Sequence, residues 1–181
     1  KGSENTLTEE GRYTVSDGGG RTWSPVKTID IGTDRDDLAV SHGVFLSTND
    51  RLWAFLGSFY GTRQRVHTRA YRYDDTTAQW VPQGTVVGGG FWPMTRPVKM
   101  HDGNWIMPGL VVGQGNPAGV AISDGDDLTK WALAWEMVRI LGRFDSWLMI
   151  EKLRGWINWP STEKDCRKCY SYEVASRDVR A

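Results

Sequence analysis

An internal repeat of about 50 residues constrains the fold of this chain more than any other feature. Four segments resemble one another: Val15–Trp23, Tyr73–Trp80, Ile122–Trp131 and Val174–Asp178. The first three each contain a polar, turn-like cluster and end in a tryptophan, with 57 and then 51 residues between successive tryptophans. A period of about 50 residues is typical of one propeller blade of four strands. The repeat therefore predicts an all-β chain of β-propeller type.

A second feature recurs in phase with the first. After each of the first three segments, two apolar runs flank a short polar turn: 42–46 with 52–56, 96–100 with 105–107, and 147–150 with 156–157. Asp-Gly and similar pairs between apolar runs favour a tight β-hairpin. We therefore expect strand, turn and strand in each repeat, with approximate repeat boundaries at 1–40, 41–94, 95–145 and 146–181.

The third segment also fits a local alternative. Asp126 and Asp127 could cap an amphipathic helix that runs to Leu141, because Leu128, Trp131, Trp135 and Val138 fall near helical spacing. The phase of the repeat instead places Trp131 at the end of a turn. We favour the turn followed by a strand.

Composition narrows the partners that the chain can bind. The 22 basic and 22 acidic residues cancel, so no charge excess favours nucleic acid or an anionic membrane. No apolar run is long enough for a membrane span. Cys166 and Cys169 form a single C-x-x-C pair, which we interpret as incidental thiols, and we expect no metal or other cofactor.

The polar clusters resemble the Asp-box, Ser-x-Asp-x-Gly-x-Thr-Trp, which is also called the bacterial neuraminidase repeat. The residues that carry this resemblance are Ser16, Asp17, Trp23, Asp74, Trp80, Ser123, Asp124 and Trp131. The chain is therefore similar to the sialidase superfamily. In that family the box is a structural turn between the third and fourth strands of a blade, on the side away from the active site.

The resemblance implies a six-bladed propeller, which at ~50 residues a blade needs roughly 300 residues. The 181 residues supply about three to four blades in a single partial domain, 1–181. We therefore expect a fragment, completed by the rest of a longer chain or by other copies. The resemblance also favours a secreted or periplasmic location, which the sequence itself does not indicate.

In a propeller of this type, the ligand site lies near the starts of the innermost strands. The hairpins place His42 and Arg96 at equivalent positions there. The resemblance implies arginines that bind a substrate carboxylate, since a guanidinium makes two parallel hydrogen bonds with it. It also implies an Asp that acts as general acid and base. The candidates are Asp36, Asp37 and His42 for catalysis, and Arg96, Trp92, Arg69 and Arg143 for substrate binding.

Three functions fit this pattern. The first is a sialidase-like glycoside hydrolase of the exo-α-sialidase type, acting on terminal acidic sugars of glycans. The second is a polysaccharide lyase or another glycosidase on the same scaffold, which a histidine-centred site with one or two arginines would favour. The third is a non-catalytic propeller that binds glycans, because a fold does not fix a function.

Overall fold

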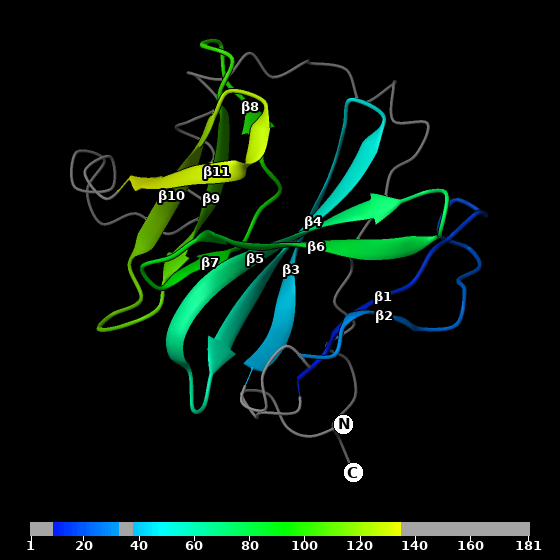
Figure 1. Ribbon diagram of the computed structural model, residues 1–181, viewed down its shortest axis with the longest axis horizontal. Helices are drawn as coiled ribbons and strands as arrows, with labels where there is room; N and C mark the ends of the chain where they lie inside the picture. Colours follow the sequence, from blue (N-terminus) through cyan, green and yellow to red (C-terminus); the bar gives the residue numbers. More distant parts are fainter. Residues whose placement is uncertain (1–8, 33–37, 135–181) are drawn as a thin grey trace.

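The computed structural model describes residues 9–32 and 38–134, and every regular element in them is a β-strand. The strands form three antiparallel sheets (Figure 1). The first sheet pairs β1 (Gly11–Tyr13) with β2 (Lys27–Asp30). The described chain is thus all-β, as predicted, and its separate, successive antiparallel sheets give it a propeller-like character.

The second sheet contains four strands in sequence order: β3 (Leu38–Thr48), β4 (Arg51–Tyr60), β5 (Gln64–Asp74) and β6 (Gln79–Val87). Asn49 and Asp50 form the turn between β3 and β4, with φ angles of 49° and 54°. Positive φ at both central residues defines the type I′ turn, whose twist suits a two-residue hairpin. The predicted hairpin over 42–56 is confirmed.

The third sheet has the order β11-β10-β9-β7, with β8 also paired to β9. Its strands are β7 (Phe91–Pro93), β8 (Val98–Lys99), β9 (Trp105–Val111), β10 (Ala118–Asp124) and β11 (Asp127–Ala134). Strands β7 and β8 pair with opposite ends of β9, so together they occupy the position of a single first strand that is interrupted in the middle. Strand β11 confirms the predicted strand and excludes the alternative helix over residues 127–134, whereas the rest of that alternative, 135–141, lies outside the described residues. The hairpin over 147–157 and the fourth segment lie outside the described residues.

Alternation along the central strands buries both faces of the second sheet. In β4, Trp53 and Phe55 face the third sheet, whereas Ala54 and Leu56 face β1 and β2. Successive side chains of a strand point to opposite faces, so a strand packed on both sides is buried along its length and mostly apolar. This requirement explains the continuous buried run over 53–59.

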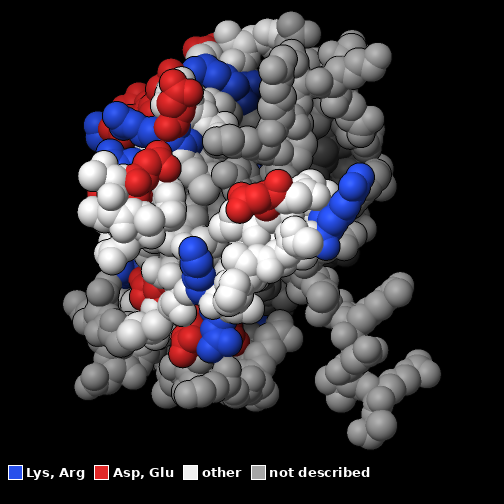
Figure 2. Space-filling view, turned by 90° about the vertical axis from the view of Figure 1, so that its right-hand side faces the viewer, with Lys and Arg blue, Asp and Glu red and all other residues white. Residues whose placement is uncertain are grey.

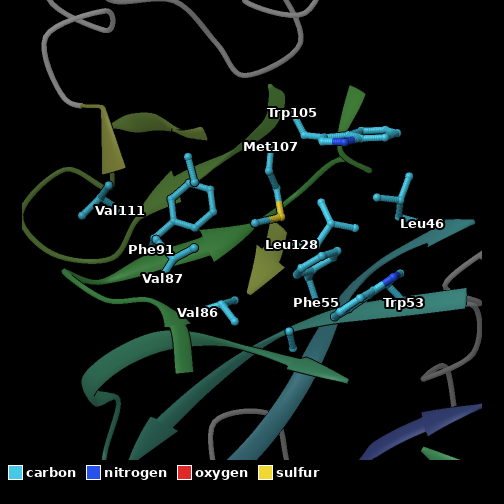
Figure 3. Close-up of a cluster of buried hydrophobic side chains, with 12 residues drawn as sticks. Leu46, Trp53, Phe55, Val86, Val87, Phe91, Trp105, Met107, Val111 and Leu128 are labelled. Carbon is cyan, nitrogen blue, oxygen red and sulfur yellow. The ribbon is translucent and has the colours of Figure 1, made fainter. Parts of the chain in front are cut away.

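The core between the second and third sheets is aromatic (Figure 3). Phe55 stacks with Trp53 at 6.2 Å between ring centroids and meets Trp131 of β11 edge to face at 5.5 Å. Met107 of β9 is fully buried in the same cluster. Each such side chain contributes roughly 1.5–3 kcal/mol through burial, so the two sheets form one packed unit.

The three Asp-box segments connect the last two strands of each sheet. They join β1 to β2, β5 to β6 and β10 to β11. Two of the tryptophans make the same bond: Nε1 of Trp23 donates to the carbonyl of Gly20 at 3.0 Å, and Nε1 of Trp131 donates to that of Leu128 at 2.7 Å. Trp80 is buried, and its Nε1 has no hydrogen-bond partner among the described residues.

A different side chain accepts the turn amide in each box. Ser16 Oγ accepts from the Gly20 amide at 2.7 Å. Asp74 accepts from the Thr76 amide at 2.9 Å, and Asp127 accepts from the Thr129 amide at 3.1 Å. Neither Asp17 nor Asp124 makes any of these described turn bonds. The turns therefore form without an Asp at one fixed position of the box, because any nearby side-chain oxygen can accept the hydrogen bond of the turn amide.

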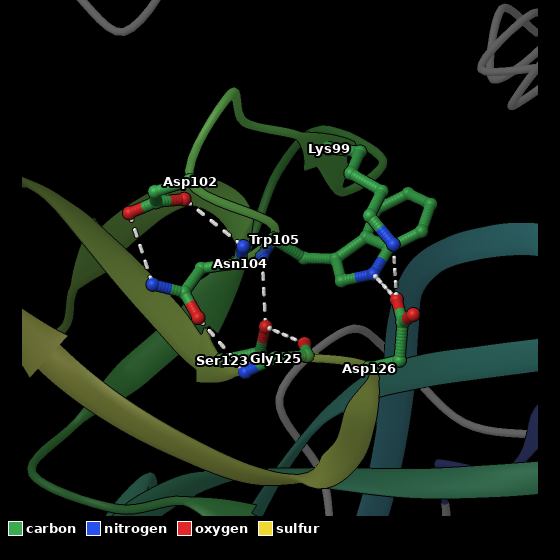
Figure 4. Close-up of polar contacts among 7 residues, drawn as sticks. All are labelled: Lys99, Asp102, Asn104, Trp105, Ser123, Gly125 and Asp126. Carbon is green, nitrogen blue, oxygen red and sulfur yellow. Dashed lines mark hydrogen bonds and ion pairs between the residues drawn. The ribbon is translucent and has the colours of Figure 1, made fainter.

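The third box is fastened to the preceding hairpin by a polar network (Figure 4). Ser123 Oγ accepts from the Trp105 amide at 2.7 Å and donates to the Gly125 carbonyl at 2.6 Å. Asp126 accepts from Trp105 Nε1 at 2.8 Å and pairs with Lys99. These bonds hold the box turn against the β8–β9 turn, at one end of the sheet.

Candidate functional site

The first strand of the second sheet is interrupted at the predicted site. Val40 pairs with Ser58 and Gly43 pairs with Leu56, so Ser41 and His42 together lie opposite the single residue between those partners. Such a β-bulge turns a side chain away from its regular direction. His42 is exposed on this strand, which lies at the edge of its sheet.

The corresponding position in the third sheet belongs to Trp92. The second and third sheets can be compared residue by residue by matching Trp80 with Trp131 and then following the strand pairing across each sheet. In this comparison Gly57 of β4 corresponds to Leu110 of β9. The bulge of Ser41 and His42 lies opposite Gly57, and Trp92 lies opposite Leu110. The spacing of the hairpins in the sequence predicts that Arg96 is equivalent to His42. The pairing of the strands instead shows that Trp92 is the residue at the position equivalent to His42.

Trp92 and His42 are in direct contact. The indole Nε1 of Trp92 donates to Nε2 of His42 at 3.2 Å, and the ring centroids are 5.2 Å apart. Because Nε2 accepts this bond, the proton of a neutral His42 lies on Nδ1, which is 3.4 Å from Ser41 Oγ. His42 can therefore act as a base at Nε2 only after the bond to Trp92 opens.

A glycine creates the space that the Trp92 ring occupies. A Cβ atom added to Gly57 would lie 2.3 Å from the indole ring. Phe59 stacks on the same ring with centroids 6.1 Å apart, and Trp92 is 6% exposed. The packing thus fixes the indole, and the indole in turn fixes the imidazole of His42.

A small cavity of about 140 Å³ lies beside His42. It is lined by Glu9, Glu10, Arg12, Ser41, His42, Gly43, Phe45 and Leu56. Arg12 and Glu10 form an ion pair at 2.7 Å, and the carbonyl of Glu9 accepts from the Val40 amide at 3.2 Å. Carboxylate, hydroxyl and guanidinium groups around an aromatic ring can make the hydrogen bonds that a sugar requires.

Arg69, a predicted substrate ligand, lies elsewhere. It is 7% exposed and faces β2, where its Nε donates to the Tyr71 hydroxyl at 3.2 Å and lies 3.9 Å from an Asp30 carboxylate oxygen. Tyr71 donates to that same oxygen at 2.6 Å. Burial and the bond to Asp30 raise the pKa of Tyr71 well above its ordinary value. This buried triad joins the first two sheets.

The remaining predicted residues are dispersed or lie outside the described part. Arg96 is exposed on the segment that separates β7 from β8. Asp36, Asp37 and Arg143 lie outside the described residues, as do Cys166 and Cys169. Of the predicted site, the structure therefore brings together His42 and Trp92.

The sequence pattern missed the charged residues around His42. Glu9 and Glu10 directly precede β1 and Arg12 lies within it, so all three come before the first Asp-box. They have no counterpart at the period of the repeat, so periodicity could not select them. Their proximity to β3 depends on how the first sheet packs against the second.

The surface charge of the described residues is mixed. Figure 2 shows acidic and basic side chains next to one another on the face in view. Residues 9–32 and 38–134 contain no group of three or more His, Cys, Asp or Glu side chains placed to hold a metal ion. They also contain no helix long and apolar enough to cross a membrane.

A scan against models of known protein families finds no match to this chain. A search of curated proteins finds no significant similarity either.

Proposed function

We propose that the chain belongs to a sialidase-type β-propeller and that the second and third sheets are two consecutive blades. The outer hairpin of the preceding blade is then β1 and β2. A complete ring of this type has six blades, supplied by the rest of a longer chain or by other copies. The position of the Asp-boxes supports this proposal, because each box joins the last two strands of its sheet.

The proposed activity is hydrolysis of a terminal acidic sugar from a glycan, as in an exo-α-sialidase. In a propeller the first strand of each blade lies beside the central channel. The contact between His42 and Trp92 links the first strands of the two sheets, and a polar cavity lies next to it. This contact carries the proposal, since successive blades then contribute jointly to one site.

Turnover of a fluorogenic sialoside by the full-length protein tests this activity. We expect release of the fluorophore, inhibition by a transition-state analogue of sialic acid, and loss of turnover in His42→Ala. Ser47→Ala, on an exposed position of the same strand, is the matched control. Turnover that His42→Ala leaves unchanged would remove His42 from the site.

One observation favours a second enzymatic function, a polysaccharide lyase or another glycosidase on the same scaffold. Arg69 is buried in the triad with Asp30 and Tyr71, which leaves fewer arginines for a substrate carboxylate. The remaining site is centred on a histidine. Release of unsaturated sugars absorbing in the ultraviolet, without sialoside turnover, would identify a lyase. Binding without any turnover would identify a glycan-binding propeller.

A further inference from the structure

Ser41 is a second side chain that the bulge in β3 brings to the cavity beside His42. In a regular strand, successive side chains point to opposite faces of the sheet. In the bulge, Ser41 Oγ and His42 Nδ1 lie only 3.4 Å apart, and both residues line the cavity of about 140 Å³. The bulge thus places a hydroxyl and an imidazole next to each other in one wall of the cavity.

The direction of the hydrogen bond between these two side chains follows from Trp92. An indole N–H can only donate, and Trp92 Nε1 donates to Nε2 of His42 at 3.2 Å. A neutral imidazole carries one proton, so with Nε2 as acceptor this proton lies on Nδ1. Nδ1 then donates to Ser41 Oγ. The hydroxyl oxygen of Ser41 is therefore the acceptor in its bond with His42.

The hydroxyl of Ser41 still has a proton to donate. Among residues 9–32 and 38–134, the contact with His42 is the one hydrogen bond that this side chain makes, so none of them accepts the proton. With one side of the oxygen occupied by Nδ1–H, the hydroxyl proton is directed away from the imidazole. Since Ser41 lines the cavity, the proton is available to a ligand there.

Packing fixes the other end of this chain of bonds. Trp92 is buried, its ring stacks on Phe59, and Gly57 leaves room for the indole. Hydrogen bonds in a chain polarise and strengthen one another. A buried indole thereby orients the exposed imidazole of His42 and, through it, the hydroxyl of Ser41.

The remaining polar groups of the cavity suit a ligand that both donates and accepts. Glu10 is a carboxylate, which accepts, and Arg12 is a guanidinium, which donates; the two also pair with each other at 2.7 Å. A sugar carries hydroxyl groups of both characters. Ser41 adds a donor on the side of the cavity where His42 lies.

We propose that Ser41 is a ligand-binding residue whose hydroxyl donates to an acceptor oxygen of the bound sugar. In this proposal Trp92 is the positioning residue, which acts on Ser41 through His42. The inference rests on the proposed glycan site and names the group that the ligand presents there. A carboxylate oxygen and a ring or hydroxyl oxygen of a sugar share the lone pair that the Ser41 proton requires.

Calorimetric titration of the full-length protein with sialyllactose and with lactose tests the role of Ser41. Ser41→Ala should weaken binding about tenfold, the effect of one lost hydrogen bond. Ser41→Thr, which keeps the hydroxyl, should restore most of the affinity, and Ser47→Ala on the same strand should match the native protein. A loss for sialyllactose alone identifies a carboxylate at Ser41, whereas equal losses for both sugars identify a ring or hydroxyl oxygen.

A double-mutant cycle tests whether Trp92 acts through His42 on Ser41. Trp92→Phe should weaken binding, because Nε2 of His42 is released and the Ser41 hydroxyl loses its orientation. Adding Trp92→Phe to Ser41→Ala should then cause little further loss. Additive losses would show that the two residues act independently. Circular dichroism of each variant checks the fold, and Ser41→Ala decides the binding role without any change to the buried indole.

The outcomes separate this inference from the proposed activity. Sialoside turnover by the native protein, with native affinities in Ser41→Ala, would support the activity and overturn the inference. Lactose binding that requires the Ser41 hydroxyl, without sialoside turnover, would support the inference and overturn the activity. Binding of neither sugar to the native protein would contradict both.

Discussion

The indole of Trp92 donates a hydrogen bond to Nε2 of His42 across 3.2 Å, although 50 residues separate them in the sequence. Trp92 lies on β7 and His42 lies on β3, at corresponding places in the first strands of two sheets. The bond requires both the bulge that exposes His42 and the absence of a side chain at Gly57. The two residues of the candidate site thus occupy equivalent positions in two successive repeats.

Trp92→Phe should change the tautomer of His42. In the native protein the indole occupies Nε2, so we expect the neutral imidazole to carry its proton on Nδ1. Phenylalanine keeps an aromatic ring but removes the donor, and Nε2–H then becomes populated. The ¹⁵N chemical shifts of the two ring nitrogens at alkaline pH measure this change. Identical shifts in both proteins would show that the bond is absent in solution.

Gly57→Ala should destabilise the protein by about 1–3 kcal/mol, because the added methyl group overlaps the Trp92 ring. Gly88→Ala is the matched control, since its Cβ meets no atom within 4 Å and its φ is not positive. It should leave the free energy of unfolding unchanged or raise it by less than about 1 kcal/mol. Urea denaturation measures both values. Equal stability of the two variants would contradict the described packing of the Trp92 ring against Gly57.

Stability should fall as the pH rises above 10, and Tyr71 should account for part of the loss. Burial and the hydrogen bond to Asp30 raise the pKa of Tyr71 above the ordinary 10.0. The folded protein then retains a proton that the unfolded chain releases, so rising pH favours unfolding. Tyr71→Phe should show a shallower decline of the unfolding free energy above pH 10. Ser47→Ala, which replaces an exposed group that does not titrate and keeps Tyr71, should show the native slope.

Ser123→Ala should cost about 1–3 kcal/mol, because the buried amide of Trp105 loses its acceptor. The same hydroxyl donates to the carbonyl of Gly125, so the box turn also loses a bond. Ser47→Ala, at an exposed position, should lie within about 0.5 kcal/mol of the native protein. Thermal unfolding of the three proteins separates these cases. A Ser123→Ala variant as stable as Ser47→Ala would show that the network in Figure 4 does not hold the turn.

The strand pattern of the described residues could be predicted from the sequence because it repeats. Apolar runs and polar turns recur at one period, and strand β11 follows that period even though its residues also fit a helix. The tryptophan that closes each box marks the final hairpin of each sheet. Packing between sheets decided between strand and helix, since Trp131 contacts Phe55 of the neighbouring sheet.

The site was less predictable because it depends on register and on charge pairing. A bulge of one residue moves His42 relative to its neighbours, and the spacing of apolar runs does not show a bulge. The burial of Arg69 depends on Asp30, which lies on another sheet.

The most direct measurement for the proposed glycan site follows the Trp92 indole N–H resonance during a titration with sialyllactose. Ligand binding beside His42 should shift this resonance saturably, and His42→Ala should abolish the shift. Neutral lactose should have little effect, because the proposed substrate is an acidic sugar. A Trp92 resonance that stays unchanged at saturating sialyllactose, or that shifts equally in His42→Ala, would contradict a glycan site at these two residues.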